Sequence, residues 1–185
     1  MSKTRDFKIT VRDGFYLSGL LLTDKPALLE HLSSKDVYET TLTIPYPYSE
    51  ADADWWLQKR IAHNGKQGKE VSLAIRDVGG KLIGVVSADN LELGTTHKAE
   101  IGYWLARQYW SKGIMTDAVK AYVKYAFEQL GLLKLVAHVF ELNIGSARVL
   151  EKAGFKLEGR LRKHFRKDGK LLDARIYGLL KEDLP

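Results

Sequence analysis

The stretch between residues 99 and 130 constrains the fold of this chain most strongly. The segment "AEIGYWLA" at residues 99–106 is typical of a strand, and "TDAVKAYVKYAFEQL" at residues 116–130 carries apolar side chains at helical spacing. A turn with a single glycine, Gly113, lies between them. This arrangement predicts a sheet in which one strand is followed by a crossover helix.

The rest of the chain alternates helical and strand patterns. Strands are predicted at residues 15–22, 70–77, 81–89, 134–140, 160–167 and 170–180, and helices at 23–34, 49–65 and 143–154. Residues 36–49 are predicted to be irregular, because Pro45 and Pro47 lie there among tyrosines. We expect Asp24 and Ser49 to cap helices at the start and Gly65 and Gly154 to end them. Gly79-Gly80 and Asp168-Gly169 are hairpin signals.

This order of elements predicts an α/β or α+β fold with a mostly antiparallel sheet. The 185 residues are enough for one domain with a substantial core, so we expect a single domain over residues 1–185.

The composition limits the chemistry. There is no cysteine, which excludes disulfides, zinc-cysteine sites and thiol nucleophiles, and the 5 histidines show no metal-ligand spacing. The N-terminus lacks the apolar region of a secretory signal, and no apolar run approaches the roughly 20 residues of a membrane span. We therefore expect a cytoplasmic protein with no bound metal and no membrane contact. The net charge of +6 favours an anionic partner: a phosphorylated cofactor, a nucleic acid or an acidic protein surface.

The glycine turn is a candidate anion site. The first N–H groups of a helix have no intrahelical acceptor, and with the helix dipole they attract anions where no side chain blocks the approach. Gly113 leaves that approach clear and Lys112 adds a positive charge. A pyrophosphate would suit this place, although a plain connecting turn explains the same glycine.

A second strand-to-helix junction occurs at "ELNIGSARVLEKAGF". Asn143 stands where the strand ends, and it is also a preferred helix N-cap. Ser146 follows three residues later and is able to satisfy local backbone groups.

Together, "AEIGYWLARQYWSKGIMTDAV" and "NIGSARVLEKAGFKLEGRLR" resemble the GNAT superfamily of acetyl-coenzyme A-dependent N-acetyltransferases. More narrowly, they resemble the branch that acetylates the N-terminal amines of ribosomal proteins. The resemblance extends from about residue 15 to residue 180. In the family motif, Gln or Arg is followed by two residues, Gly, one residue, and Gly or Ala. Here Trp110 stands at the first position, Gly113 matches, and Met115 stands at the last.

The resemblance implies a twisted sheet whose two central parallel strands, residues 99–106 and 134–140, splay apart to admit acetyl-coenzyme A. The backbone amides of Lys112, Gly113, Ile114, Met115 and Thr116 would cradle its pyrophosphate. The backbone of Tyr103, Trp104 and Leu105 would bond the pantetheine amides from one wall. The side chain of Asn143 would bond from the other.

Acetyl transfer to an amine needs a neutral amine, a donor for the oxyanion and a proton for the leaving thiolate. Many family members use a Tyr for the last task, but Leu150 occupies its position here, so Ser146 is the candidate acid. Glu100 is the candidate base, acting through water. Strand alternation places Glu100, Gly102 and Trp104 on one face of their strand and Ile101, Tyr103 and Leu105 on the other. A salt bridge explains Glu100 equally well, and local capping explains Ser146.

The acceptor is less defined. Tyr46, Tyr48 and Trp55 lie in the segment that covers the acceptor site in this family, whereas Trp56 is expected in the core. An N-terminal amine is an easier acceptor than a lysine, because about a tenth of it is neutral near pH 7. A polyamine, an antibiotic amine or a free amino acid remains an alternative acceptor.

The densest basic run is "RLRKHFRKDGK", from Arg160 to Lys170. It would suit contact with RNA or a ribosomal surface, and a non-catalytic RNA-binding module is the most distant alternative. It is equally typical of a solvated hairpin whose charges protect a sheet edge. For assembly, a monomer and a homodimer both remain open.

Overall fold

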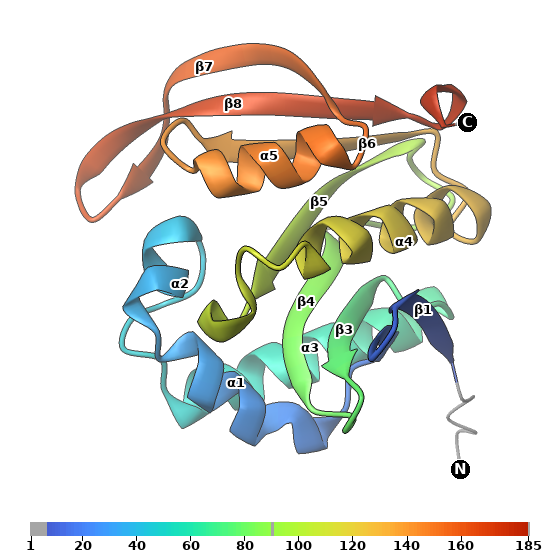
Figure 1. The fold of residues 1–185 in the computed structure, drawn as a ribbon, viewed down its shortest axis with the longest axis vertical. Helices are drawn as coiled ribbons and strands as arrows, with labels where there is room; N and C mark the ends of the chain where they lie inside the picture. Colours follow the sequence, from blue (N-terminus) through green and yellow to red (C-terminus); the bar gives the residue numbers. More distant parts are fainter. Residues whose placement is uncertain (1–6, 90, 185) are drawn as a thin grey trace.

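The computed structural model describes residues 7–89 and 91–184. Within them, eight strands form one sheet in the order β1-β2-β3-β4-β5-β6-β8-β7 (Figure 1). Of the neighbouring pairs only β5 and β6 run parallel. The predicted mixed, mostly antiparallel sheet is therefore confirmed. The strands are β1 (Lys8–Arg12), β2 (Phe15–Gly19), β3 (Ser72–Asp77), β4 (Leu82–Asp89), β5 (Lys98–Leu105), β6 (Lys134–Phe140), β7 (Lys156–Lys167) and β8 (Lys170–Leu180).

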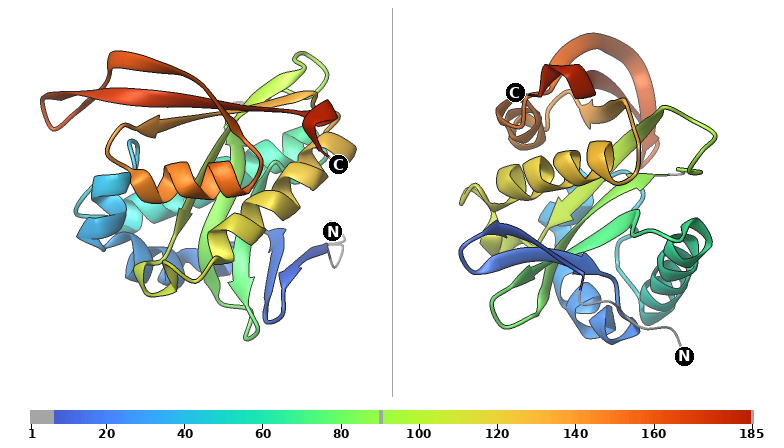
Figure 2. Two further views of the ribbon diagram at one scale, coloured as in Figure 1. Left: turned by 45° about the horizontal axis from the view of Figure 1, so that its top comes forward. Right: turned by 90° about the vertical axis from the view of Figure 1, so that its right-hand side faces the viewer.

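Helices cover both faces of the sheet (Figure 2). On one face α4 and α5 pack over a core that includes the fully buried Tyr122 and Leu150. On the other face α1 and α3 enclose a second core around Leu28 and Leu57. The α-helices are α1 (Lys25–Leu32), α2 (Lys35–Thr40), α3 (Glu50–Gln67), α4 (Ile114–Glu128) and α5 (Ile144–Lys152), and the short 3-10 helices are η1 (Leu22–Asp24), η2 (Arg107–Tyr109) and η3 (Lys181–Asp183).

The predicted alternation of β5 is confirmed by these two cores. Ile101 and Leu105 are buried in the core under α4, whereas Trp104 is buried in the core under α1 and α3. Because successive side chains of a strand point to opposite faces, Glu100 and Gly102 share the face of Trp104. This places the candidate base on the α3 side of the sheet.

Two segments differ from the prediction. Residues 35–40, predicted as irregular, form helix α2, which is anchored by the buried Val37. The prolines that suggested irregularity lie beyond its end. Residues 8–12 form the edge strand β1, which the sequence analysis did not predict.

Helix ends follow the predicted chemistry in part. Ser49 caps α3, since its side chain accepts from the Asp52 N–H, and Asp52 accepts in turn from the Ser49 N–H. The predicted end at Gly65 is wrong, because α3 continues to Gln67 and ends at Gly68, whose φ of 65° is left-handed. Helix α4 begins at Ile114, two residues before the predicted start.

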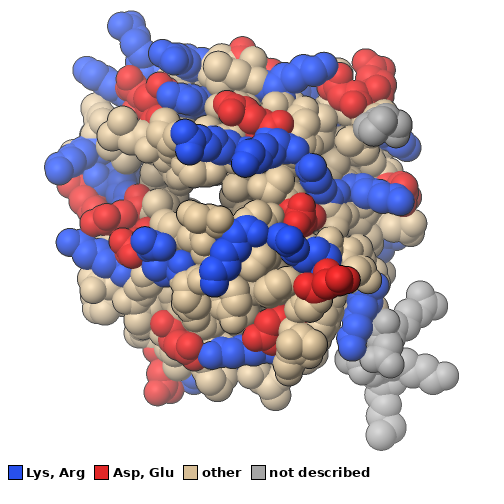
Figure 3. Space-filling view, in the orientation of Figure 1, with Lys and Arg blue, Asp and Glu red and all other residues tan. Residues whose placement is uncertain are grey.

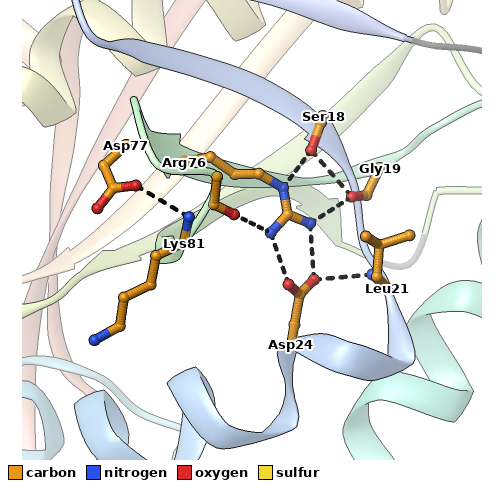
Figure 4. Close-up of polar contacts among 8 residues, drawn as sticks. Ser18, Gly19, Leu21, Asp24, Arg76, Asp77 and Lys81 are labelled. Atoms are coloured by element: carbon orange, nitrogen blue, oxygen red, sulfur yellow. Dashed lines mark hydrogen bonds and ion pairs between the residues drawn. The ribbon is translucent and has the colours of Figure 1, made fainter.

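Asp24 precedes α1 as predicted, but its side chain does not cap that helix. Instead, both carboxylate oxygens accept from Arg76, at 2.7 and 2.9 Å, in a buried bidentate pair (Figure 4). Arg76 also donates to Ser18 Oγ and to the carbonyls of Gly19 and Gly80, so all five of its donors are used. This network joins β2, β3 and η1, the short helix that leads into α1.

Candidate active site

The centre of the sheet opens between β5 and β6. Their parallel pairing ends at Glu100 and Val136. On either side the ladders continue, because β4 pairs with β5 as far as Leu105 and β6 pairs with β8 as far as Phe140. The two parallel strands therefore diverge beyond Glu100, which is the expected splay.

Beyond Glu100 the edge of β5 that faces β6 has no ladder partner among the described residues. The Ala106 N–H donates to Ile83 O near the start of β4, so alternate peptide groups of β5 point the other way, toward β6. By this alternation the peptide groups of Tyr103 and Leu105 face the gap, whereas those of Trp104 face β4. The Leu105 carbonyl is used within the chain, since it accepts from Trp110 Nε1 at 2.7 Å. Trp110 thus braces the turn after β5.

The turn before α4 has the geometry of an anion cradle. Gly113 occupies the N-cap position with φ 77°, and no side chain caps it. The first helical bond runs from the Asp117 N–H to Gly113 O, so the N–H groups of Ile114, Met115 and Thr116 precede the ladder. The side chains of Ile114 and Met115 are buried in the core, so the methionine at the family's Gly/Ala position leaves the cradle clear.

An arginine that the sequence analysis missed supports this turn. Arg12 on β1 donates from Nη1 to the Lys112 carbonyl at 3.0 Å and lies 3.3 Å from Asp117 Oδ2. A Cβ added to Gly113 would lie 3.5 Å from the same Nη1. Lys112 itself is exposed, with its ammonium 5.7 Å from the centre of the Tyr109 ring. Arg12 was not recognisable because β1 was not predicted.

Two cavities meet inside the splay. One, of about 440 Å³, lies beside the Gly113 turn and α5, and the other, of about 420 Å³, lies on the side of α3. The residues that line both are Thr40, Thr41, Tyr103, Trp104, Asn143 and Ser146. Figure 3 shows an opening through the molecule where Figure 1 has α2, α5 and the turn before α4. We call the first the turn-side cavity and the second the α3-side cavity.

Asn143 and Ser146 lie where the cavities join. Asn143 Oδ1 accepts from the Ser146 N–H at 3.0 Å, which confirms Asn143 as the N-cap of α5. Its Nδ2 donates to Thr40 O at 3.3 Å. Ser146 Oγ lies 2.8 Å from Tyr103 Oη. Burial raises the pKa of Tyr103, so this phenol stays protonated at neutral pH. The buried Leu150 leaves the family's tyrosine position without a polar group.

Glu100 lies at the top of the splay, with half of its side chain exposed. Its Oε1 is 2.8 Å from His138 Nδ1 on β6, and both residues line the α3-side cavity. The alternative role of Glu100 was a salt bridge to a lysine or arginine, but among the described residues its partner is the imidazole of His138. Sequence reasoning missed His138 because it sits in an otherwise apolar strand with no motif around it.

The predicted acceptor aromatics are only partly brought together. Tyr48 and Trp55 line the α3-side cavity, Tyr48 almost fully buried and Trp55 largely exposed. Burial raises the pKa of Tyr48 to about 12. Tyr46 does not line either cavity; its ring packs 5.4 Å from Tyr38. Trp56, expected in the core, packs against it and also borders the cavity.

Helix α2 bridges the opening. Lys167, near the end of the β7–β8 hairpin, donates to the carbonyls of Tyr38 and Thr41 at 2.7 and 2.6 Å. Asp168 accepts from Tyr38 Oη, and on the other side Arg107 donates to Asp36 at 3.0 Å. Figure 2 shows α2 beneath the end of the hairpin. Two side chains of the basic run are therefore paired within the structure, Lys167 and, 3.7 Å from Glu141, Arg160. The others, Arg162, Lys163, Arg166 and Lys170, are exposed.

The sequence profile described as an acetyltransferase (GNAT) domain matches residues 15–156. The chain belongs to the GNAT family of acetyltransferases. It is 44% identical over 103 residues to YjcK of Bacillus subtilis, named a "probable N-acetyltransferase", a match that covers 56% of this chain and 57% of that protein. It is 35% identical over 154 residues to YdaF of Bacillus subtilis, named a "putative ribosomal N-acetyltransferase", covering 83% of this chain and 75% of that protein.

The fold is also that of a solved structure, RimL, described as a ribosomal L7/L12 α-N-protein acetyltransferase in complex with coenzyme A. The TM-score is 0.84 at 20% identity, covering 96% of this chain and 100% of that chain. Among the residues that the structure describes there is no cluster of potential metal ligands, and none of the helices described is long and apolar enough to cross a membrane.

Proposed function

We propose that this GNAT protein transfers the acetyl group of acetyl-coenzyme A to a primary amine, the N-terminal α-amine of a ribosomal protein. The observation that carries the proposal is the meeting of two cavities inside the β5–β6 splay. One has an unobstructed helix N-terminus at its wall, and the other has a carboxylate–imidazole pair at its wall. A two-substrate transfer needs this separation, with the reacting groups at the junction.

The turn-side cavity fits the cofactor. A pyrophosphate would be held by the N–H groups of Ile114, Met115 and Thr116, with Lys112 and Arg12 supplying positive charge. The peptide groups of Tyr103 and Leu105 and the side chain of Asn143 would hold the pantetheine. When bound, the cofactor supplies the thioester carbonyl that the amine attacks.

The α3-side cavity fits a cationic acceptor. Asp52, Asp89 and Glu100 line it, and a protonated amine is attracted by this charge before it loses its proton. Of the two protons that the amine gives up, one goes to the Glu100–His138 pair and on to water. The other would go to the leaving thiolate, with Ser146 at the junction of the cavities as its donor. Tyr103 Oη at 2.8 Å polarises that serine, which makes it a better donor than an isolated hydroxyl.

The assignment to a ribosomal N-terminus rests on the names of YdaF and RimL and on the easy deprotonation of an α-amine. A panel of acceptors with acetyl-coenzyme A tests it: peptides with a free Ala or Ser N-terminus, the same peptides with the terminus blocked and a free lysine, spermidine and an aminoglycoside. We expect free N-termini to be acetylated fastest. Faster turnover of spermidine or the aminoglycoside would move the acceptor to the small-molecule class.

A further inference from the structure

The imidazole of His138 holds a defined orientation across the top of the splay. Its Nδ1 is 2.8 Å from Glu100 Oε1. An ionised carboxylate only accepts hydrogen bonds, so in the neutral imidazole the proton sits on Nδ1 and the lone pair on Nε2. The contact therefore selects the tautomer in which Nε2 is the basic nitrogen.

That Nε2 belongs to a side chain that lines the α3-side cavity. It has no hydrogen-bond partner among the residues that the structure describes, and it is not among the buried atoms that lack one. The side chain as a whole is only 19% exposed, against 50% for Glu100. The imidazole is thus the more enclosed member of the pair, and it stands on the wall of the cavity proposed for the acceptor.

Neighbouring rings fix the plane of the imidazole. His164 on β7 stacks on it with centroids 5.1 Å apart and an interplanar angle of 16°. Phe165 meets it edge-on at 6.3 Å. A ring held by a carboxylate at one nitrogen and by stacking on one face is preorganised to receive a proton at the other nitrogen.

We infer that His138 Nε2 takes the proton from the acceptor ammonium and that Glu100 is a positioning residue. The inference rests on the proposed function and revises the role of Glu100 as base. The N–H bond of the ammonium breaks, its electron pair stays on the amine nitrogen, and an Nε2–H bond forms. The imidazolium, stabilised by Glu100, then returns the proton to water in the cavity.

Other ionisable groups around the imidazole do not take this role. His164 faces it from β7, but among the residues described no carboxylate pairs with His164 to orient its ring. Asp89 lines the same cavity but is bound by Arg60 at 2.7 Å and by Ser87 at 3.0 Å. Asp52 is engaged at the start of α3 with Ser49. Lys134, on the same face of β6, is paired with Glu158.

The test is a pH–rate profile of kcat/KM for the wild type and three variants, with an acetylatable peptide and acetyl-coenzyme A. His138→Gln keeps a hydrogen bond to Glu100 but has no basic nitrogen, and we expect a loss of about 10²–10³-fold. Glu100→Gln still accepts from Nδ1–H. We expect less than about tenfold loss at pH 8, because the basic nitrogen is still present and still oriented by a hydrogen bond at Nδ1. His97→Gln, at an exposed histidine that lines neither cavity, is the matched control and should stay within about threefold of the wild type.

Melting temperature and acetyl-coenzyme A binding of each variant show that it is folded with an intact cofactor site. If His138→Gln is nearly as active as the wild type, or if Glu100→Gln loses about 10²-fold or more, the carboxylate is the base and this inference is overturned. Either result leaves the proposed function standing. A wild type that acetylates no amine at all overturns both.

Discussion

The buried pair of Arg76 and Asp24 is the most demanding interaction at the scale of single residues (Figure 4). Arg76→Met leaves the Asp24 carboxylate buried without its counter-charge, so we expect a loss of about 3–5 kcal/mol in the free energy of unfolding. Denaturation by urea measures it. Adding Asp24→Asn removes the stranded charge while keeping an acceptor for the Leu21 N–H, and at least about 1 kcal/mol should return. A single variant that costs under 1 kcal/mol would show that the pair adds little.

His31 makes stability depend on pH. The side chain is buried and its Nε2 lacks a partner among the residues described; this burial lowers the pKa of His31 below its usual 6.5. In the window below pH 6.5 the unfolded chain therefore binds more protons than the folded one, and stability falls as the pH falls. Between pH 7.5 and 5.5 the wild type should lose up to about 1.4 kcal/mol more than His31→Leu. Leucine at the exposed His97 should leave the wild-type pH dependence intact; an identical slope in His31→Leu would contradict the assignment.

The roles of single residues could be predicted from the sequence where those roles depend on local geometry. The Ser49 cap, the Asn143 cap and the open turn at Gly113 depend on neighbours within a few positions. Asp24 was predicted as a cap and is an ion pair, because its partner Arg76 is 52 residues away. The pairing of Glu100 with His138 likewise depends on where two strands separate, and no local pattern shows that.

At the scale of elements, helix α2 spans the opening and is held there by the β7–β8 hairpin on one side and by Arg107 on the other. Lys167→Met removes two hydrogen bonds to its C-terminal carbonyls, each a charge-assisted bond of about 1.5–3 kcal/mol. We expect the amides of α2 to lose at least roughly tenfold of their hydrogen-exchange protection, and KM for the acceptor to rise more than KM for acetyl-coenzyme A.

Lys170→Met, at an exposed site on the same hairpin, is the control. Unchanged exchange in α2 after Lys167→Met would mean that the bridge does not depend on this lysine. Helix α2 was not predicted because its 6 residues are too few to show a helical pattern. The side chains that hold it also come from distant segments, the β7–β8 hairpin and the start of α5.

At the scale of the whole molecule, the class of fold was predictable, because the long strand–turn–helix unit and the hairpin signals have clear periods. The splay could be expected only from the family resemblance. Beyond Glu100, β5 stays hydrogen-bonded to β4 and β6 stays hydrogen-bonded to β8, while the pairing between β5 and β6 ends. Which of these pairings persists depends on the whole sheet. The turn-side and α3-side cavities follow from that separation, and no single segment of the sequence predicts them.

The most direct test of the account is the change in melting temperature on adding acetyl-coenzyme A. At about 100 times its dissociation constant the ligand adds ~2.7 kcal/mol, which for a chain of this length should raise the melting temperature by roughly 5–10 °C. Gly113→Val should abolish most of the shift, since valine is strained at the left-handed φ of 77° and its side chain would meet Arg12, which holds this turn. Gly131→Val, at an open position with a similar φ of 72°, carries the same backbone strain and should keep the shift. No shift in the wild type, or a large shift with RNA in its place, would contradict the acetyltransferase account.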